Sequence, residues 1–397
     1  ARMGQFEAYV ADTWKVTRKL TLDLGLRFYR ITPTFARDNT ISTFNPGVFS
    51  LAKAQRVIPT GSSAGQLMPG VGEPYNGILV AGSNFPDPGT VPADPKGRSL
   101  FGGLPKGIYD NQHKVGPRLG FAYDLTGRGI FAVRGAAGIA HERFSESMIE
   151  DAGKNPPFVK TVSLFDGNLE DLGSGRTAEF PISVSGFRPN MQAQSVYNWN
   201  FGFQWKAPTD SLVDFNYVST QGRHLMRRVN INQLTPAVRV ANLTVNQNSV
   251  RPYQGYTDIL LWETSASSNY HALQVSATRR YAKNLTYSLA YTWAKALTDA
   301  WDINSQPEDN NNYRNEKSYA NYNKTHVFNF SFIYQFPFFT AQRGVVGRLL
   351  GGWSVTGITS LESGRYFNVS ISTLAGSRRP DRVGDFKYMD ARTVRTF

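Results

Sequence analysis

Alternation of apolar and polar side chains is the feature that most constrains the fold of this chain. In residues 20–28, every second side chain is apolar, and Thr, Asp, Gly and Arg fill the positions between them. A period of two residues is typical of a β-strand with one apolar and one polar face. The same pattern recurs, with aromatic residues on the apolar side, in 197–205, 285–293 and 328–336. Strands of this kind suit a barrel wall that faces lipid outside and water inside.

Mean composition conceals this pattern. The 397 residues are 41% hydrophobic, with a mean hydropathy of −0.36, values that an ordinary soluble protein would also have. Alternation lets one face stay apolar while the average stays polar. No run approaches the roughly 20 apolar residues that a membrane-spanning helix needs, so a helical membrane protein is excluded. Aromatic residues make up 13% of the chain, as expected for rings gathered at membrane interfaces.

Cysteine content and charge exclude several classes of function. The chain contains no Cys, so disulfide frameworks, thiolate metal sites and cysteine nucleophiles are absent. The formal charge is +13, which raises the question of nucleic-acid binding. Its basic residues are dispersed, and several fall in short turns, where they would meet lipid headgroups. We therefore expect no nucleic-acid partner.

The pattern predicts eleven strands. Their lengths centre near the roughly 9–11 residues that a tilted strand needs to cross a bilayer. They are expected at 5–14, 20–30, 117–125, 129–140, 195–206, 211–220, 269–281, 285–297, 326–337, 351–361 and 365–371. An open sheet edge in lipid would leave backbone groups unpaired, and bacterial barrels usually have an even number of strands. We therefore expect further strands from a longer protein, with the chain beginning inside it because residues 1–6 carry no signal-peptide pattern.

The predicted connections alternate between short and long. Tight turns are expected at 16–19, 126–128, 207–210 and 282–284, and long loops at 31–116, 141–194, 221–268 and 298–325. Short periplasmic turns and long extracellular loops are what an outer-membrane barrel has, whereas a soluble sandwich has no reason to segregate them. There are two exceptions. The link 338–350 is long although it lies on the side of the short turns, and the link 362–365 is tight although it lies on the side of the long loops. Within the loops we expect one short amphipathic helix, over 142–150.

Charged side chains on the polar side of the strands are the candidate site residues, because they would line the lumen and meet a substrate or an internal partner. These candidates are Asp23, Arg27, Arg118, Asp124, Arg134 and Arg280. Two roles are open for these side chains. We favour ion pairs with the internal partner over contact with substrate.

Catalytic patterns are not found. The five histidines are widely separated and lack metal-ligand spacing, and Walker A, Rossmann and nucleophile-elbow motifs are absent as working motifs. Asp299, Asp302, Glu308 and Asp309 offer oxygen ligands to Ca²⁺, but their spacing does not fit an EF-hand, and a solvated polar loop is the favoured reading. We therefore expect no enzyme activity, no catalytic residues, no metal and no cofactor.

A series of segments resembles the barrel of TonB-dependent receptors, and more narrowly the Oar-like class, whose members carry a carboxypeptidase-regulatory-like domain. In the family's order the segments are 6–16 with 20–28, 116–123 (GPRLGFAY), 133–139 (VRGAAGI), 216–225 (NYVSTQGRHL), 269–275 (NYHALQV), 291–297 (YTWAKAL) and 352–358 (GWSVTGI). They span nearly the whole chain. One departure is 323–326, Asn-Lys-Thr-His, where the family usually has an acidic residue ahead of a basic pair and His.

The resemblance implies that residues 1–397 are part of one barrel domain of about 22 strands with a plugged lumen. The signal sequence, regulatory-like domain, TonB-contacting segment, plug and closing strands would belong to the rest of the protein, and we expect 390–397 to be an interrupted loop. The implied function is energy-coupled uptake, or export, of an unknown ligand captured by the extracellular loops. The implied partners are outer-membrane lipid and, through the plug, the TonB complex, in the outer membrane of a Gram-negative bacterium.

Two rival functions remain open at this point. A passive porin or a surface adhesin would use the same kind of barrel without energy coupling. A soluble carbohydrate-binding β-protein would instead bury its apolar rows between two packed sheets.

Overall fold

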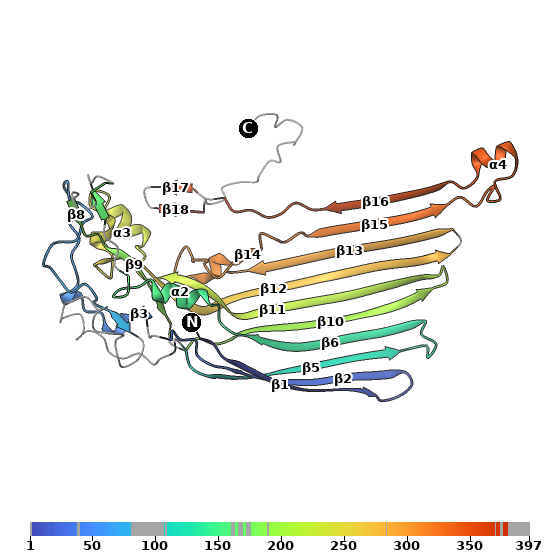
Figure 1. Cartoon of the computed structure of the whole chain (residues 1–397), viewed down its shortest axis with the longest axis horizontal. Coiled ribbons are helices and arrows are strands. Elements are labelled where there is room, and N and C mark those ends of the chain that lie inside the picture. Colours follow the sequence, from blue (N-terminus) through green and yellow to red (C-terminus); the bar gives the residue numbers. More distant parts are fainter. Residues whose placement is uncertain are drawn as a thin grey trace.

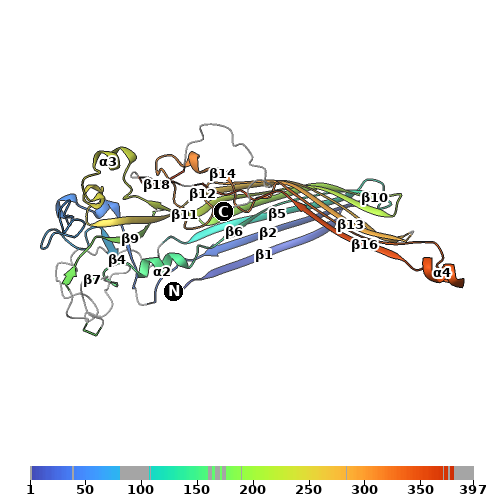
Figure 2. The same ribbon diagram turned by 90° about the horizontal axis from the view of Figure 1, so that it is seen from above.

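The wall of the molecule is one curved antiparallel sheet. Figure 1 shows its strands side by side, and Figure 2 shows the sheet from above. The computed structural model describes residues 2–37, 40–80, 107, 109–159, 163–165, 170–171, 176–188, 190–282, 284–369, 371–373 and 376–379. The wall strands are β1 (Gln5–Lys15), β2 (Leu20–Ile31), β5 (Gln112–Asp124), β6 (Phe131–Glu142), β10 (Gln194–Ala207), β11 (Ser211–Asn230), β12 (Tyr256–Ala282), β13 (Leu285–Thr298), β15 (His326–Gln335) and β16 (Ser354–Glu362).

These strands pair in chain order, each antiparallel to the next. The strands β9 (Ile182–Phe187) and β14 (Ser318–Tyr319) pair with β12 and β13 and complete a 12-stranded open sheet. Antiparallel pairing of consecutive strands in a single open layer fits part of a transmembrane barrel. The predicted fold class is confirmed.

The strand register keeps like side chains on the same face. Asp23 on β2 lies opposite Thr13 on β1 and Gly120 on β5, while its neighbour Leu22 lies opposite Trp14 and Phe121. Because side chains alternate between faces along a strand, this register produces continuous polar rows on one face and apolar rows on the other.

Strand boundaries follow the predictions most closely where alternation is strict. The strands predicted at 20–30 and 285–297 are β2 and β13, each longer by one residue at its end. The predictions for 211–220 and 269–281 are too short, because β11 continues to Asn230 and β12 begins at Tyr256. At 20 and 27 residues, these two strands exceed the roughly 9–11 needed to cross a bilayer, so they project beyond it.

The eleventh predicted strand, 365–371, is wrong over 365–369, where the chain forms no strand. Its Tyr366 ring instead stacks on Tyr319 of β14, with ring centroids 4.2 Å apart, so this residue packs on a loop element and not on the edge of β16. Among the described strands, β17 (Ile371–Thr373) pairs only with β18 (Gly376–Arg378). The predicted loop 390–397 lies outside the described residues.

The remaining elements lie in the connections. The short strands are β3 (Ser42–Phe44), β4 (Ile78–Val80), β7 (Ser163–Phe165) and β8 (Arg176–Ala178), and the helices are α2 (Ser147–Gly153), α3 (Pro236–Ala241), α4 (Gly344–Leu350) and the 3-10 turns η1 (Pro46–Val48), η2 (Leu51–Lys53), η3 (Gln247–Val250) and η4 (Tyr313–Glu316). The helix predicted at 142–150 is therefore displaced to α2, since Glu142 still belongs to β6. Among the described residues, no helix is long and apolar enough to cross a membrane.

The buried core lies beyond the sheet, in what we call the outer assembly: the described parts of 32–111, 143–193, 231–255 and 299–325, with the outer ends of β11 and β12. One cluster gathers Phe144, Met148, Met191, Met226 and Trp262 with further apolar residues, and another gathers Phe44, Ile78, Val184, Tyr256, Ile259 and Leu261. The long loops are thus packed against one another at one end of the wall (Figure 2).

Candidate functional site

The apolar face of the wall is exposed. Leu119, Phe201 and Trp293 on this face have 58%, 55% and 55% of their surface exposed. Stacked aromatic pairs such as Phe203 and Phe215, with centroids 4.8 Å apart, run along it. Among the described residues, no second sheet covers these rows, so they are not the buried layer that the soluble carbohydrate-binding alternative requires. A broad apolar face of this kind is suited to contact with acyl chains.

The polar face holds the predicted charged residues. By register, Asp23, Arg27, Arg118 and Arg134 share this face across β2, β5 and β6. Arg280 has the same parity as Thr278 on β12 and lies near the short-turn end of the wall, away from the other four. The structure therefore brings four of the six candidates onto neighbouring strands. Their orientation toward a lumen stays a prediction.

Hydrogen bonds link the polar face from strand to strand. The Thr13 hydroxyl donates to the Asp23 carboxylate at 2.7 Å, and Arg27 Nη1 pairs with Glu7 Oε2 at 2.9 Å. Further along the face, Arg134 donates to Gln204 Oε1 at 3.0 Å. The Gln204 amide in turn donates to Asp214 Oδ1 at 2.8 Å. A row of polar groups bonded to one another along one face suits a hydrated barrel interior.

A hollow of about 520 Å³ lies on this face beside the charged residues. It is lined by polar side chains, including Asp23, Arg118, Asn198 and Asn200, and by small residues, including Gly25, Gly120, Ala136 and Gly138. The small residues carry little side-chain volume and so leave the space open. The hollow therefore presents a carboxylate, from Asp23, and a guanidinium, from Arg118, in one lining.

Asp124 closes the turn between β5 and β6. Its Oδ1 accepts hydrogen bonds from the backbone N–H groups of Thr126 and Gly127, at 3.1 and 2.9 Å, and its Oδ2 accepts one from Gly129 at 2.8 Å. Gly127 and Gly129 both have positive φ, of 69° and 68°. The local sequence Asp-Leu-Thr-Gly-Arg-Gly was the signal for this turn, because Asp and Gly are the residues such a turn needs. A plug contact for Asp124 stays a prediction.

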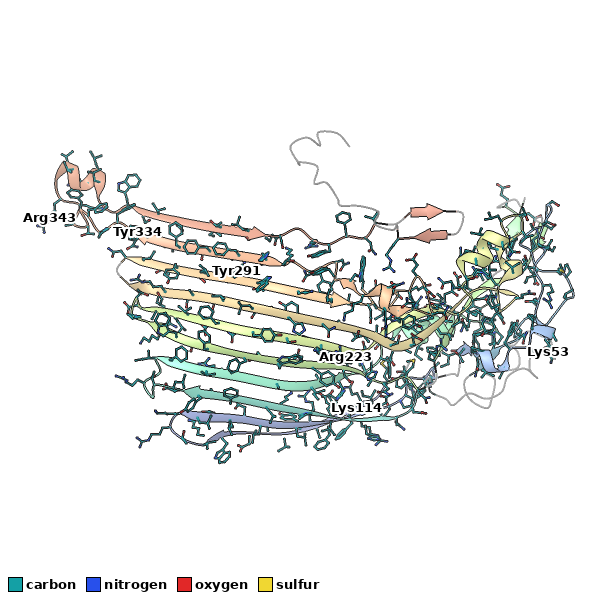
Figure 3. All side chains as sticks on the ribbon, turned by 180° about the vertical axis from the view of Figure 1, so that it is seen from behind. Lys53, Lys114, Arg223, Tyr291, Tyr334 and Arg343 are labelled. Carbon is teal, nitrogen blue, oxygen red and sulfur yellow. The ribbon has the colours of Figure 1, made fainter. Side chains whose placement is uncertain are left out.

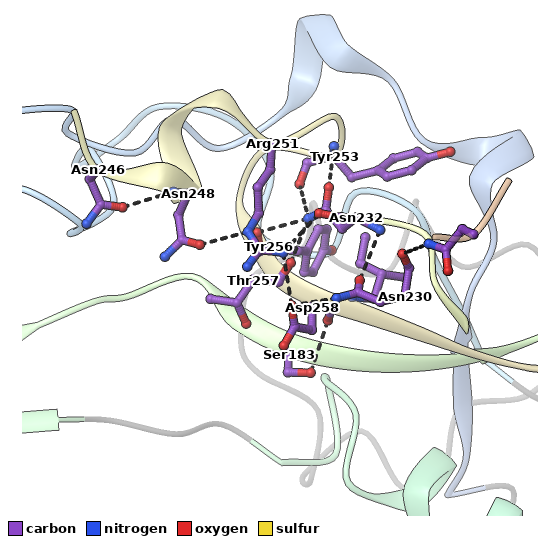
Figure 4. Close-up of polar contacts among 12 residues, drawn as sticks. Ser183, Asn230, Asn232, Asn246, Asn248, Arg251, Tyr253, Tyr256, Thr257 and Asp258 are labelled. Carbon is purple, nitrogen blue, oxygen red and sulfur yellow. Dashed lines mark hydrogen bonds and ion pairs between the residues drawn. The ribbon is translucent and has the colours of Figure 1, made fainter. Parts of the chain in front are cut away.

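Buried amides hold the outer assembly together, as Figure 4 shows for Asn232. The fully buried Asn232 side chain donates to the carbonyls of Tyr253, Tyr256 and Thr257, at 2.8–3.1 Å. Its Oδ1 accepts from the Tyr253 backbone N–H at 2.8 Å. Arg251 Nη1 bonds both the Asn232 carbonyl and Asp258 Oδ1, each at 2.9 Å. This network ties the loop 231–255 to the outer end of β12.

A second hollow, of about 470 Å³, lies in the outer assembly. Its lining includes Phe44, Tyr109, Asp110, Phe187, Arg188 and Asn190. Arg188 Nε pairs with Glu263 Oε2 at 3.3 Å, while 44% of the arginine side chain is exposed. Burial, followed by the negative charge of Glu263 and a hydrogen bond to it, raises the pKa of Tyr313 to about 12. Sequence reasoning missed this site, because its lining comes from two long loops and the outer part of β12, which show no shared sequence pattern.

The acidic loop considered for Ca²⁺ has other contacts. The Asp299 carboxylate accepts hydrogen bonds from Arg227 and from Ser267, Asp302 accepts from the Asn304 N–H at 2.8 Å, and Glu308 pairs with Arg379 at 3.1 Å. In the part of the chain that the structure describes, no three acidic or histidine side chains gather as a metal site would.

One protein family and several solved structures are similar to this chain. A family model described as "Outer membrane beta barrel domain" matches residues 1–396. A search of curated proteins found no match. The FrpB iron transporter from Neisseria meningitidis is 9% identical with a TM-score of 0.39, and the match covers 85% of this chain and 32% of that one.

The outer membrane transporter YddB from Escherichia coli is 8% identical with a TM-score of 0.42, and the match covers 83% of this chain and 39% of YddB. The copper transporter OprC is 9% identical with a TM-score of 0.40, and the match covers 90% of this chain and 34% of OprC. The chain thus spans about a third of the length of these transporters. Because the family model covers all but one of its residues, the chain is part of a membrane barrel rather than an enzyme, and it belongs to the outer membrane beta barrel domain family, in the outer membrane of Gram-negative bacteria.

Proposed function

We propose that the chain forms part of the barrel wall of a TonB-dependent outer-membrane transporter, and more narrowly of an Oar-like receptor. The observation that carries this proposal is the bonded polar face of the wall, with its charged hollow at Asp23 and Arg118. The ordered sequence motifs support the same family. Residues 1–397 then form one part of the barrel domain, and the rest of the protein supplies the plug, the regulatory-like domain and the closing strands.

The polar face suits contact with a plug. Among the described residues, Arg118 has no ion-pair partner, so its guanidinium is free to pair with a plug carboxylate. Asp23 and Arg134 keep bonds to neighbouring strands and would orient that contact. In this proposal Arg27 and Arg280 also face the lumen, with Arg27 held by Glu7. These residues bind the plug, and substrate passes them only when the plug rearranges.

The outer assembly suits ligand capture. Its hollow beside Tyr109, Asp110 and Arg188 presents an aromatic ring with both signs of charge, and the packed loops hold these groups in place. Captured ligand would then cross the membrane when the TonB complex, driven by the proton-motive force, acts on the plug. Uptake is the proposed direction of transport, and export is the alternative direction. The similar transporters FrpB and OprC are named for iron and copper, so complexes of these two metals are the first cargo to screen.

The test needs no knowledge of the cargo. Full-length protein, purified and inserted into planar lipid bilayers, is expected to be closed to ions, because a plug fills the lumen. The same protein is expected to bind the periplasmic domain of TonB in a calorimetric titration. A steady open conductance would identify a passive porin. A closed barrel that does not bind TonB would leave an adhesin as the better function, and either result would overturn the proposal.

A further inference from the structure

The link between β15 and β16 differs from every other described connection on the short-turn side. It runs through residues 336–353, contains the helix α4, and extends past the ends of the neighbouring strands (Figure 1). Figure 3 shows Arg343 at its tip, beyond Tyr334 at the end of β15. The other short-side links, such as 16–19 and 125–130, are tight turns. A longer link therefore needs a reason.

The link is apolar and exposed. Among its side chains, the exposed fractions are 54% for Phe338, 50% for Phe339, 76% for Val345, 57% for Val346, 66% for Leu349, 53% for Leu350 and 62% for Trp353. Burying apolar surface stabilises by about 25 cal/mol per Å², so leaving a patch of this size in water is costly. A contiguous exposed apolar patch marks an interaction surface.

This surface continues the lipid-facing row of the wall. The ring of Tyr334 contacts that of Phe336, with centroids 5.3 Å apart, and Phe336 contacts Phe338 at 5.4 Å. The Phe336 N–H donates to the Trp353 carbonyl at 3.0 Å, which extends the β15–β16 pairing to this position. By that register, Trp353 lies on the apolar face. Its indole N–H donates to the Leu349 carbonyl at 2.8 Å and so joins α4 to this face.

The charges of the link match a phospholipid surface. Residues 336–353 contain Arg343 and Arg348 and no acidic residue. Arginine side chains place their stems along apolar surface and their charged heads at the headgroups. Tryptophan prefers the same interface. Charge and apolarity together point to anionic lipid rather than to bulk water.

We propose that residues 336–353 form an in-plane membrane anchor, with α4 lying at the boundary between headgroups and acyl chains of the periplasmic leaflet. The link would fix the depth and tilt of this side of the barrel. The proposal rests on the family membership and on the short links being periplasmic, and not on energy coupling. It can therefore fail while the transporter proposal stands, and the reverse also holds.

Site-directed spin labelling tests the anchor. Single cysteines, Val345→Cys and Leu349→Cys, are introduced into a cysteine-free full-length protein and labelled with a nitroxide. The protein is reconstituted in vesicles of phosphatidylethanolamine and phosphatidylglycerol. Both labels are expected to collide more often with lipid-dissolved oxygen than with a water-soluble nickel chelate. Arg18→Cys, in the exposed β1–β2 turn, is the matched control and is expected to show the opposite ratio.

Two outcomes would overturn the proposal. Frequent collision of the Val345 and Leu349 labels with the nickel chelate would place the link in water. Protection from both reagents would show that protein covers it, either a second copy of the chain or another part of the barrel.

The arginines are tested separately, in the variant Arg343→Gln with Arg348→Gln that also carries Val345→Cys. Its oxygen-to-nickel ratio is expected to fall in vesicles containing phosphatidylglycerol and to stay unchanged in vesicles of phosphatidylcholine alone. An unchanged ratio in both would overturn the headgroup contact.

Discussion

Arg227 on β11 and Asp299, just after β13, form an ion pair of 2.5 Å in the outer assembly, with only 1% of the arginine side chain exposed. The Asp299 carboxylate also accepts hydrogen bonds of 2.8 Å from the Ser267 N–H and from its hydroxyl. The Arg227 guanidinium lies 4.7 Å from the centre of the Tyr313 ring. This pair therefore joins three segments that are far apart in the sequence.

Removing one partner of this pair should loosen the outer assembly. In the full-length protein, Asp299→Ala is expected to cost about 3–5 kcal/mol locally, because it leaves the buried Arg227 charge uncompensated. The measurement is hydrogen exchange of the backbone amides in 256–267, which should exchange faster. Asp302→Ala is the matched control, since Asp302 is an exposed carboxylate three residues further along the same loop. Equal exchange in the two variants would show that the pair does not hold the assembly.

Alkaline pH should weaken the same region through Tyr313. Its pKa is raised from 10.0 to about 12, first by burial and then by the negative charge of Glu263, with Arg188 and Arg227 opposing the rise. A raised pKa means that the folded state favours the protonated phenol. The resulting stability is present below pH 10 and is lost as the pH rises toward 12. Protection of the amides in 256–267, measured relative to their base-catalysed intrinsic exchange rates, should therefore fall in this range, and Tyr313→Phe should remove that fall.

Much of the wall was predictable because alternation is a local signal. In β2 and β13, one face meets apolar surroundings and the other polar ones, so the period of two is visible in the sequence itself. The outer half of β12 was missed for the opposite reason. Its residues 259–262, Ile-Leu-Leu-Trp, lie where loops cover both faces, and buried strands lose alternation. Periodicity cannot distinguish such a run from a buried helix.

The candidate site was predictable only as a face. Alternation places Asp23, Arg118 and Arg134 on the polar side, but it does not show that Thr13 bonds Asp23, because that contact depends on strand register. Asp124 has the same parity, yet it caps a turn. The hollow beside Arg188 in the outer assembly was not predictable, since contacts between distant loops leave no local pattern.

The facing of the wall can be tested with residues that are adjacent in the chain. Leu24→Cys and Asp23→Cys lie on opposite faces of β2, so a maleimide carried on a lipid tail should label the first and a water-soluble maleimide the second. Leu22→Cys and Leu26→Cys should behave like Leu24→Cys, whereas Thr21→Cys and Gly25→Cys should behave like Asp23→Cys. The experiment uses full-length protein in vesicles. A reversed labelling pattern would place the charged row in lipid and refute the assignment.

Arg118→Glu tests the proposed plug contact in the lumen. If Arg118 pairs with a plug carboxylate, the substitution replaces attraction by repulsion, and even a partly exposed pair contributes up to about 1 kcal/mol. The closed full-length barrel should then show intermittent ion conductance in planar bilayers. Arg128→Glu makes the same charge change in the β5–β6 turn, outside the hollow, and should leave the barrel closed. Folding of the variant is checked by the change in its gel mobility on heating. A folded Arg118→Glu barrel that stays closed would show that Arg118 does not contact the plug.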